Sequence, residues 1–373
     1  MTFFRRIIKA VRTNALPGAI GFRLRQLAYA NSHPGDHYLK LSPRVLWRLA
    51  EQPMKFSIDV VSTCNLACPT CPVDNWPKDS WTGAKGIMDA ALLHQLIRKA
   101  ISECLVGTID LFAYTEPLLH PRLPELVAIV KSYGLRCMIS TNLNVMRDAD
   151  ALLAANPDEI SISVSGFHQD TYGVTHAGGD IKVVKKHMRT LADAKQRLAS
   201  KTKVVVFFHK YRTNLGDLPL MKDFATSLGL DFDECWASFF PLEKVLTYAR
   251  PELALAEITE ADRSIIDRLA VPLTDVVELA SRTPAHSCTL QDTAIVLDVT
   301  GNVYLCCDAA MDAKRNRIAS YLDSTLETVQ ARKKNHSLCT TCMASGLPLH
   351  GGREIRDQGS GIRERTSSLI PVP

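Results

Sequence analysis

Apolar and polar residues follow two alternating periods along the middle of the chain. Short stretches rich in Val, Ile and Phe predict strands at residues 55–61, 107–113, 135–141, 158–165, 202–209 and 231–240. Between them, apolar residues at three- and four-residue spacing predict helices at residues 88–105, 123–134, 147–155, 181–199, 217–229 and 259–270. Strands that alternate with helices are typical of βα units, which build a parallel sheet.

The six βα units occupy roughly residues 54–270, and six are fewer than an ordinary closed βα-barrel requires. We therefore expect an α/β fold that is either a partial barrel or an open parallel sheet. In both architectures ligands bind at the carboxyl ends of the strands.

The last hundred residues have a different pattern. Residues 294–307 predict a β-hairpin that turns near Gly301. Four cysteines surround this hairpin, with Cys307 beside the second of them: Cys288, Cys306, Cys339 and Cys342. We expect a small metal-stapled domain over residues 285–345 and a loose tail, rich in Gly, Arg and Ser, over residues 350–373.

The first 50 residues are strongly basic. They contain nine Lys or Arg against one acidic residue, whereas the whole chain has a net charge of +5. Such a segment attracts phosphate groups or anionic lipid. Its apolar residues recur at helical spacing, which leaves two interpretations open. One is an amphipathic helix that contacts a membrane, and the other is a helix docked on the main domain with solvated basic ends.

Composition narrows the class of protein. Hydrophobic residues make up 46% and charged residues 22%, as in globular domains with a sizeable core. No apolar run approaches the roughly 20 residues that span a bilayer, and the N-terminus lacks the apolar region of a secretory signal. We therefore predict a cytoplasmic protein, in which eleven cysteines favour metal or redox chemistry over disulfides. The basic residues gather in one terminal arm, which argues against a nucleic-acid partner.

The stretch STCNLACPTCP, residues 62–72, places three cysteines directly after the first predicted strand: Cys64, Cys68 and Cys71. Three thiolates do not complete a tetrahedral zinc site, unless a distant residue such as His94 or His120 supplies the fourth ligand. They can instead hold three irons of a [4Fe–4S] cluster and leave the fourth iron open to a small ligand, whereas most electron-transfer clusters have four cysteines.

This C-x3-C-x2-C loop, followed by repeated βα units, resembles the radical S-adenosylmethionine (SAM) superfamily over about residues 54–240. The resemblance implies a partial (β/α)6 barrel and a [4Fe–4S] cluster whose open iron binds the amino and carboxylate groups of SAM. It implies that one electron splits the sulfonium and that the 5′-deoxyadenosyl radical abstracts a hydrogen atom from the substrate. It also implies a reducing partner such as flavodoxin or ferredoxin.

The family's Gly-Gly-Glu-Pro motif, at the end of the second strand, corresponds here to Tyr114, Thr115, Glu116 and Pro117. Glu116 and Pro117 match, and both glycines are replaced. The resemblance implies that Glu116, with Thr115 and Pro117 beside it, contacts the SAM amino group. A solvated loop acid is the alternative for Glu116.

Three further residues are candidates for SAM contacts by the same resemblance. Asn142 ends the third strand, in Ser-Thr-Asn, and Ser163 and Ser165 end the fourth. The serines would contact the methionine carboxylate or the ribose, and ordinary strand-end residues are the alternative. Thr70 stands where the family commonly has an aromatic residue near the adenine, which leaves the adenine wall unassigned. The stretch HAGGD, residues 176–180, is open to two interpretations, a phosphate cradle or a plain helix start.

The C-terminal pattern C-x12-G-x4-C, then C-x2-C, is similar to the twitch domain, a shortened SPASM domain of many radical SAM enzymes. It implies one auxiliary [4Fe–4S] cluster held by Cys288, Cys306, Cys339 and Cys342, with structural zinc as the alternative. Asp308 is a candidate base for an oxidation in which the cluster accepts an electron. A hairpin-end carboxylate without such a role is the alternative.

The predicted function is reductive cleavage of SAM and hydrogen abstraction from a small polar substrate. A sugar, an aminocyclitol or a nucleotide- or lipid-linked sugar would fit, in an oxidation or dehydration assisted by the auxiliary cluster. One alternative is a maturase that oxidises or cross-links side chains of a ribosomal peptide. An alternative of another class is a non-enzymatic, metal-stapled scaffold that binds a partner.

Overall fold

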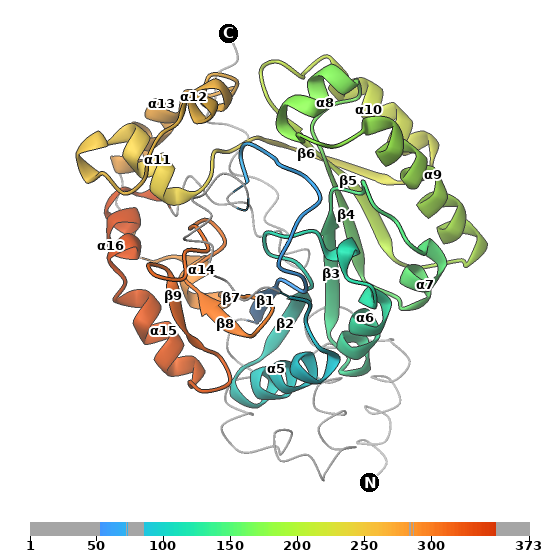
Figure 1. The fold of residues 1–373 in the computed structure, drawn as a ribbon, viewed down its shortest axis with the longest axis horizontal. Coiled ribbons are helices and arrows are strands. Elements are labelled where there is room, and N and C mark those ends of the chain that lie inside the picture. The colour runs from blue at the N-terminus through green and yellow to red at the C-terminus, as the bar shows by residue number, and fades with distance from the viewer. Residues whose placement is uncertain (1–52, 72, 74–85, 283–284, 286, 348–373) are drawn as a thin grey trace, which may run out of the picture.

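The computed structural model describes residues 53–71, 73, 86–282, 285 and 287–347, and Figure 1 shows how their elements are arranged. The helix expected within residues 1–50 and the tail expected over residues 350–373 lie outside this part of the chain. None of the described helices is both long enough and apolar enough to cross a bilayer.

Six parallel strands form the larger part of one sheet and follow one another in chain order. They are β1 (Met54–Ile58), β2 (Val106–Asp110), β3 (Arg136–Thr141), β4 (Glu159–Val164), β5 (Lys203–Lys210) and β6 (Asp231–Trp236). Each coincides with a predicted strand to within a few residues, so the predicted succession of βα units is confirmed.

The predicted helices are also present. They are α5 (Ala90–Glu103), α6 (Leu123–Ser132), α7 (Ala149–Ala154), α9 (Ile181–Arg197), α10 (Asp217–Ser227) and α12 (Glu260–Ile266). The periodicity did not predict α8 (Gln169–Thr175), α11 (Leu242–Ala249) and α13 (Leu273–Ser281). These three helices have seven to nine residues each, about the length of α7 and α12.

Helices cover the outer face of this curved sheet (Figure 1), and the strands alternate accordingly. In β4, Ile160, Ile162 and Val164 are buried, whereas Ser161 and Ser163 between them are only half-buried. A doubly wound sheet has helices on both faces and is apolar on both. The alternation therefore matches the partial barrel, with an apolar outer face and a polar inner face, and not the open sheet.

The predicted C-terminal hairpin is present and extends the same sheet. Strand β7 (Ala294–Leu297) pairs in parallel with β1, and β8 (Asn302–Tyr304) and β9 (Arg317–Ser320) follow in antiparallel pairing. The turn contains Gly301 at φ +82°, a left-handed conformation that glycine adopts without strain. The helices α14 (Thr289–Thr293), α15 (Leu326–Lys334) and α16 (Ser337–Ala344) complete this part.

The hairpin shares a hydrophobic core with the barrel. Phe56 of β1 packs against Tyr321 with ring centroids 5.6 Å apart, and Val329 and Leu338 belong to the same buried cluster.

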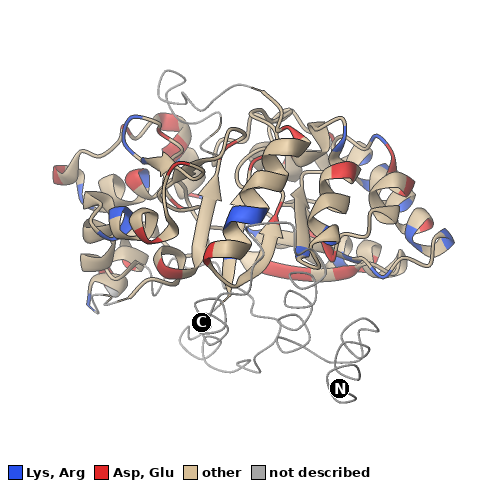
Figure 2. Cartoon of the chain, turned by 90° about the horizontal axis from the view of Figure 1, so that it is seen from below, with Lys and Arg blue, Asp and Glu red and all other residues tan. Residues whose placement is uncertain are grey.

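In the face drawn in Figure 2, Lys and Arg are interspersed with Asp and Glu along the described helices.

Candidate functional site

The cysteine loop leaves the carboxyl end of β1 and lies against the ends of the neighbouring strands. The amide of Cys71 donates to the carbonyl of Cys68 at 3.0 Å, which closes a turn between the second and third cysteines. The amide of Ala67 donates to the carbonyl of Ala177 at 2.8 Å, so the HAGGD stretch packs on this loop. All three thiols are half-buried and none forms a disulfide.

Glu116 is buried at 3% exposure, so it is not a solvated loop acid. Its carboxylate accepts hydrogen bonds from the Thr141 hydroxyl at 2.7 Å, the Asn142 amide at 2.8 Å and the Leu118 amide at 3.0 Å. Burial raises the pKa of Glu116 to about 7, and these hydrogen bonds act in the opposite direction. The side chain is therefore held rigidly and titrates near neutral pH. Pro117 begins the short 3-10 helix η2 (Pro117–Leu119) that Glu116 caps.

Asp59 holds the segment that replaces the two glycines of the family motif. Its Oδ1 accepts from the amides of Ala113, Tyr114 and Thr115 at 2.9, 3.0 and 3.0 Å. It also accepts from the Thr115 hydroxyl at 2.7 Å. Burial raises the pKa of Asp59, and the four hydrogen bonds counter that rise. The sequence signal for this residue is one acid within the otherwise apolar stretch IDVV.

Asn142 ties the end of β3 to the cysteine loop. Its side-chain nitrogen donates to the Asn65 side chain at 3.0 Å and to the sulfur of Cys64 at 3.7 Å. Asn144, two residues later, donates to the hydroxyl of Tyr172 at 2.7 Å. The strand end, the first cysteine and helix α8 are thereby connected.

The two candidate serines have different environments. Ser165 is 1% exposed and bonds to Nδ1 of His176 at 2.8 Å and to the hydroxyl of Thr175. The His176 ring stacks on Tyr172, and burial lowers the pKa of His176 to about 3. Ser165 therefore belongs to a buried packing network, whereas Ser163 is half-buried on the inner face of β4.

The HAGGD stretch ends in an ordinary helix start. Asp180 is the N-cap of α9, and its side chain accepts from the Lys182 amide at 2.8 Å. A side-chain oxygen already caps this helix, as the helix-start interpretation expects.

The C-terminal cysteines act electrostatically on a buried lysine. Lys333 of α15 is 1% exposed, and its ammonium donates to the carbonyls of Leu290 at 3.0 Å and Ala294 at 2.7 Å. Burial lowers the pKa of Lys333, and the charges of nearby cysteines raise it; these are Cys306, Cys339, Cys288 and Cys307. The pKa of Cys342 is raised to about 12 by burial and by Cys288 and Cys339. Sequence reasoning missed Lys333, because it is one of three consecutive basic residues in the last turn of a helix, where basic residues are common.

The zinc alternative for the cysteine loop needs a fourth ligand from another part of the chain. Within the ranges that the structure describes, no three His, Cys, Asp or Glu side chains form a site for a metal ion. His94 bonds to the Tyr133 hydroxyl at 2.9 Å, and both ring nitrogens of His120 bond to main-chain atoms of Met88 and Arg122. His120 therefore has no ring nitrogen left to bind zinc.

Asp308 lies close to the C-terminal cysteines and to Tyr114. Its charge contributes to raised pKa values of Cys306, of Cys342 and of the Tyr114 phenol. Its carbonyl accepts from the amide of Leu242 at 2.7 Å, which fixes its main chain at the start of α11. Its own carboxylate is half-buried.

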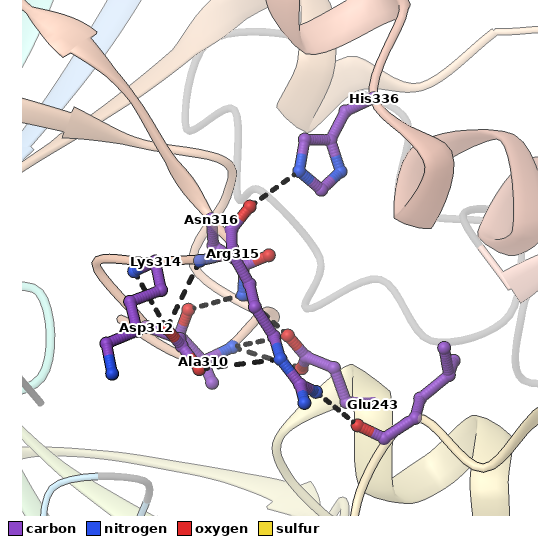
Figure 3. A network of polar contacts seen from close by, with 8 residues as sticks. Glu243, Ala310, Asp312, Lys314, Arg315, Asn316 and His336 are labelled. Carbon is purple, nitrogen blue, oxygen red and sulfur yellow. Dashed lines mark hydrogen bonds and ion pairs between the residues drawn. The ribbon is translucent and has the colours of Figure 1, made fainter. Parts of the chain in front are cut away.

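Figure 3 shows the polar network that holds the loop after Asp308. Buried Glu243 accepts from the Ala310 amide at 3.1 Å and from the Asn316 side chain at 2.6 Å. Asp312 accepts from the Lys314 amide at 2.9 Å, which closes a turn within the loop. This loop is therefore anchored on α11 rather than left to solvent.

Replacing Asp59 tests the anchor of the motif segment. Asp59→Ala leaves three buried amides without an acceptor, so we expect the free energy of unfolding to fall by about 3 kcal/mol or more. Asp59→Asn keeps one acceptor oxygen and should restore most of this loss. Asp148→Ala, which removes an exposed helix cap that accepts from Ala151, should cost about 1 kcal/mol. Urea unfolding followed by circular dichroism measures all three, and equal losses for both alanine variants would contradict the assignment.

Comparisons with known proteins agree with this geometry. Residues 58–213 match the family model of the radical SAM superfamily. The probable GTP 3′,8-cyclase of Methanococcus maripaludis is 22% identical over 54% of this chain and 64% of its own length, so the chain spans less than two thirds of that relative.

The chain is also similar to solved structures. Streptococcus suis SuiB bound to the precursor peptide SuiA has a TM-score of 0.51 at 11% identity, over 80% of this chain and 70% of that one. BtrN in complex with AdoMet and 2-DOIA aligns over 79% of this chain and 89% of that one, at 18% identity and a TM-score of 0.45. Residues 58–213, which contain the cysteine loop and most of the six-strand barrel, are therefore similar to the radical SAM superfamily.

Proposed function

We propose that the chain cleaves SAM reductively at the carboxyl ends of β1 to β4 and oxidises a small polar substrate bound between its two cysteine groups. The observation that carries this proposal is a second set of cysteines whose charges act on buried Lys333. These cysteines connect, through the segment Cys306–Ala309 and Tyr114, to the loop that carries Cys71.

In this proposal each polar group has a defined task. Cys64, Cys68 and Cys71 hold one [4Fe–4S] cluster, and the C-terminal cysteines hold an auxiliary one: Cys288, Cys306, Cys339 and Cys342. When bound, the two clusters and SAM supply the 5′-deoxyadenosyl radical and a one-electron acceptor. Glu116 pairs with the ammonium group of SAM, and Asn142 and Ser163 border the same space.

The remaining candidates either position the residues that bind SAM or accept a proton from the substrate. Thr115 and Pro117 fix the segment around Glu116, and Thr115 does so through its two bonds to Asp59. Ser165 acts indirectly, through His176, to support the end of β4. Asp308 accepts the proton that the substrate loses when it is oxidised, since it lies beside the segment between the two groups.

Two observations support a small phosphorylated or sugar-like substrate. The curated relative is named for a reaction of GTP, a nucleotide. The inner face of the barrel is polar, as the half-buried Ser161 and Ser163 illustrate. A polar inner face suits a hydrogen-bonding substrate better than an apolar one. The reducing partner would be a flavodoxin or ferredoxin.

Iron content distinguishes the two cysteine groups. After anaerobic reconstitution, the variant with Cys64, Cys68 and Cys71 changed to Ala should retain about four irons per chain and form no 5′-deoxyadenosine. Cys104→Ala, at a buried cysteine of neither group, should retain the wild-type iron content and activity.

Two outcomes would contradict parts of the proposal. Near-zero iron with bound zinc in the triple variant would make the C-terminal site structural and remove the oxidation mechanism. Absence of 5′-deoxyadenosine from the reduced wild-type protein would leave only the binding scaffold.

The pH dependence of SAM affinity tests Glu116. Its pKa of about 7 lies above the ordinary value because of burial, so the free protein carries a proton there at lower pH. Pairing with an ammonium requires the carboxylate, so SAM affinity should rise by about tenfold per pH unit below pH 7 and level off above it.

Equilibrium dialysis with labelled SAM at pH 5.5 to 8 measures this profile. Glu116→Gln should bind SAM more weakly and without the slope. A flat wild-type profile, or a slope that survives in Glu116→Gln, would assign the ammonium contact to another group.

The buried charge of Lys333 tests the auxiliary cluster. Reduction adds negative charge, and a nearby ammonium stabilises the reduced form, so Lys333→Met should make the C-terminal cluster harder to reduce. Lys334→Met is the matched control, because Lys334 is exposed and pairs with Asp292 at 3.1 Å. A redox titration followed by electron paramagnetic resonance (EPR) compares them. Equal midpoints for Lys333→Met and the wild type would remove Lys333 from this role.

A further inference from the structure

Tyr114 contacts both cysteine groups, which are far apart in the sequence. Its main-chain oxygen lies 3.9 Å from the thiol of Cys71. Its hydroxyl donates to the carbonyls of Cys306 at 2.9 Å and Ala309 at 2.7 Å. One residue thus connects the third cysteine of the first loop to the segment that carries a cysteine of the second group.

The barrel side of this connection is rigid. The Tyr114 amide donates to Asp59, together with the amides on either side of it. The Tyr114 ring packs against a small apolar cluster that contains Val296, Tyr304 and Met311. Burial raises the pKa of the Tyr114 phenol well above its usual value, so the hydroxyl keeps the proton that it donates.

The other side is rigid as well. The carbonyl of Asp308 accepts from Leu242, and the amide of Ala310 donates to Glu243, both at the start of α11. The Tyr114 bonds to Cys306 and Ala309 lie on the same short segment. The Tyr114 hydroxyl shares its one proton between these two carbonyls, so a displacement of Cys306 would act on Tyr114 and, through the Tyr114 main chain, on its contact with Cys71.

The sheet alone does not make this connection. Strand β7 pairs with β1 only from Lys55–Ala294 to Ile58–Leu297, and both cysteine loops begin beyond these pairs. The glycine that the family motif has at this position has no side chain to reach the second group, whereas tyrosine spans the distance.

We propose that Tyr114 is a positioning residue that couples the two cysteine groups, so that filling the C-terminal group strengthens SAM binding at the first. The inference rests on the proposed function, in which each group holds a cluster. Coupling between sites is reciprocal, so either ligand can be used to measure it.

A double-mutant cycle measures the coupling through SAM affinity and requires no substrate. The C-terminal group is emptied with the double change Cys339→Ser and Cys342→Ser, which leaves Cys306 and its carbonyl in place. In the Tyr114 background we expect this change to weaken SAM binding by about fivefold. In the Tyr114→Phe background, which lacks the hydroxyl, the same change should weaken binding by less than about twofold.

Tyr304→Phe is the matched control, because Tyr304 belongs to the same apolar cluster but not to the connection. It should preserve the full fivefold effect. Iron content and circular dichroism establish that each protein is loaded and folded. A loss of the same size in the Tyr114 and Tyr114→Phe backgrounds, or a Tyr304→Phe protein that also loses the effect, would overturn the inference.

A second measurement uses the wild-type sequence alone. Addition of SAM should change the EPR spectrum of the reduced C-terminal cluster, and Tyr114→Phe should abolish that change. An unchanged wild-type spectrum would overturn the coupling while the proposed function stands. Failure of the reconstituted wild-type protein to bind SAM would instead contradict the proposed function itself.

Discussion

The buried carboxylate of Asp59 is the interaction on which the geometry of the site depends. One of its oxygens accepts three consecutive main-chain amides and a hydroxyl, all from the segment Ala113–Thr115. Its second oxygen has no hydrogen-bond partner among the described residues. The cost of burying this carboxylate is offset by the four donors on one side. Glu116 directly follows this segment, and Tyr114 lies within it. The hydrogen bonds to Asp59 therefore fix the main chain that positions both residues.

The polar inner face of the barrel explains why such groups can be placed there. Helices bury the outer side of each strand, and the inner side carries residues such as Ser57, Asp59 and Asp110. Asp110 pairs with Lys55 at 2.6 Å and accepts from the Ser57 hydroxyl at 3.4 Å. Salt bridges of this kind satisfy charge inside the barrel. The polar groups that can contact a ligand then lie at the carboxyl ends of the strands, beside the cysteine loop.

The sequence predicted the parts of the fold that local periodicity controls. The six barrel strands and the helices between them show a period of two or of about 3.6. Helices α8, α11 and α13 were not predicted, although Leu242, Val245, Leu246 and Ala249 of α11 stand at helical spacing. The hairpin turn at Gly301 was visible from its residues, but the parallel pairing of β7 with β1 was not. That pairing joins segments more than two hundred residues apart, and packing of the shared core selects it.

Some residues of the candidate site could likewise be identified from local sequence, and others only from the structure. The cysteines and Glu116 were identifiable because their spacing or motif is local in the sequence. Lys333 and Asp59 were not, because their importance comes from partners that approach from other elements: the carbonyls of Leu290 and Ala294 for Lys333, and the motif segment for Asp59. Ser165 was identified as a site residue, and its partners His176 and Thr175 instead place it in the packing behind the strand end.

Tyr114 and Thr115 stand where the motif that this segment resembles has two glycines, and side chains at these positions restrict the main chain. Asp59 holds the amides of both residues, so the main chain of this segment is fixed in one conformation. Once the main chain is fixed, the Tyr114 side chain has a defined direction and can serve as a connection to Cys306. A flexible segment at the same place would allow the hydroxyl bonds to form without transmitting any displacement, so rigidity at Asp59 is a condition for coupling at Tyr114.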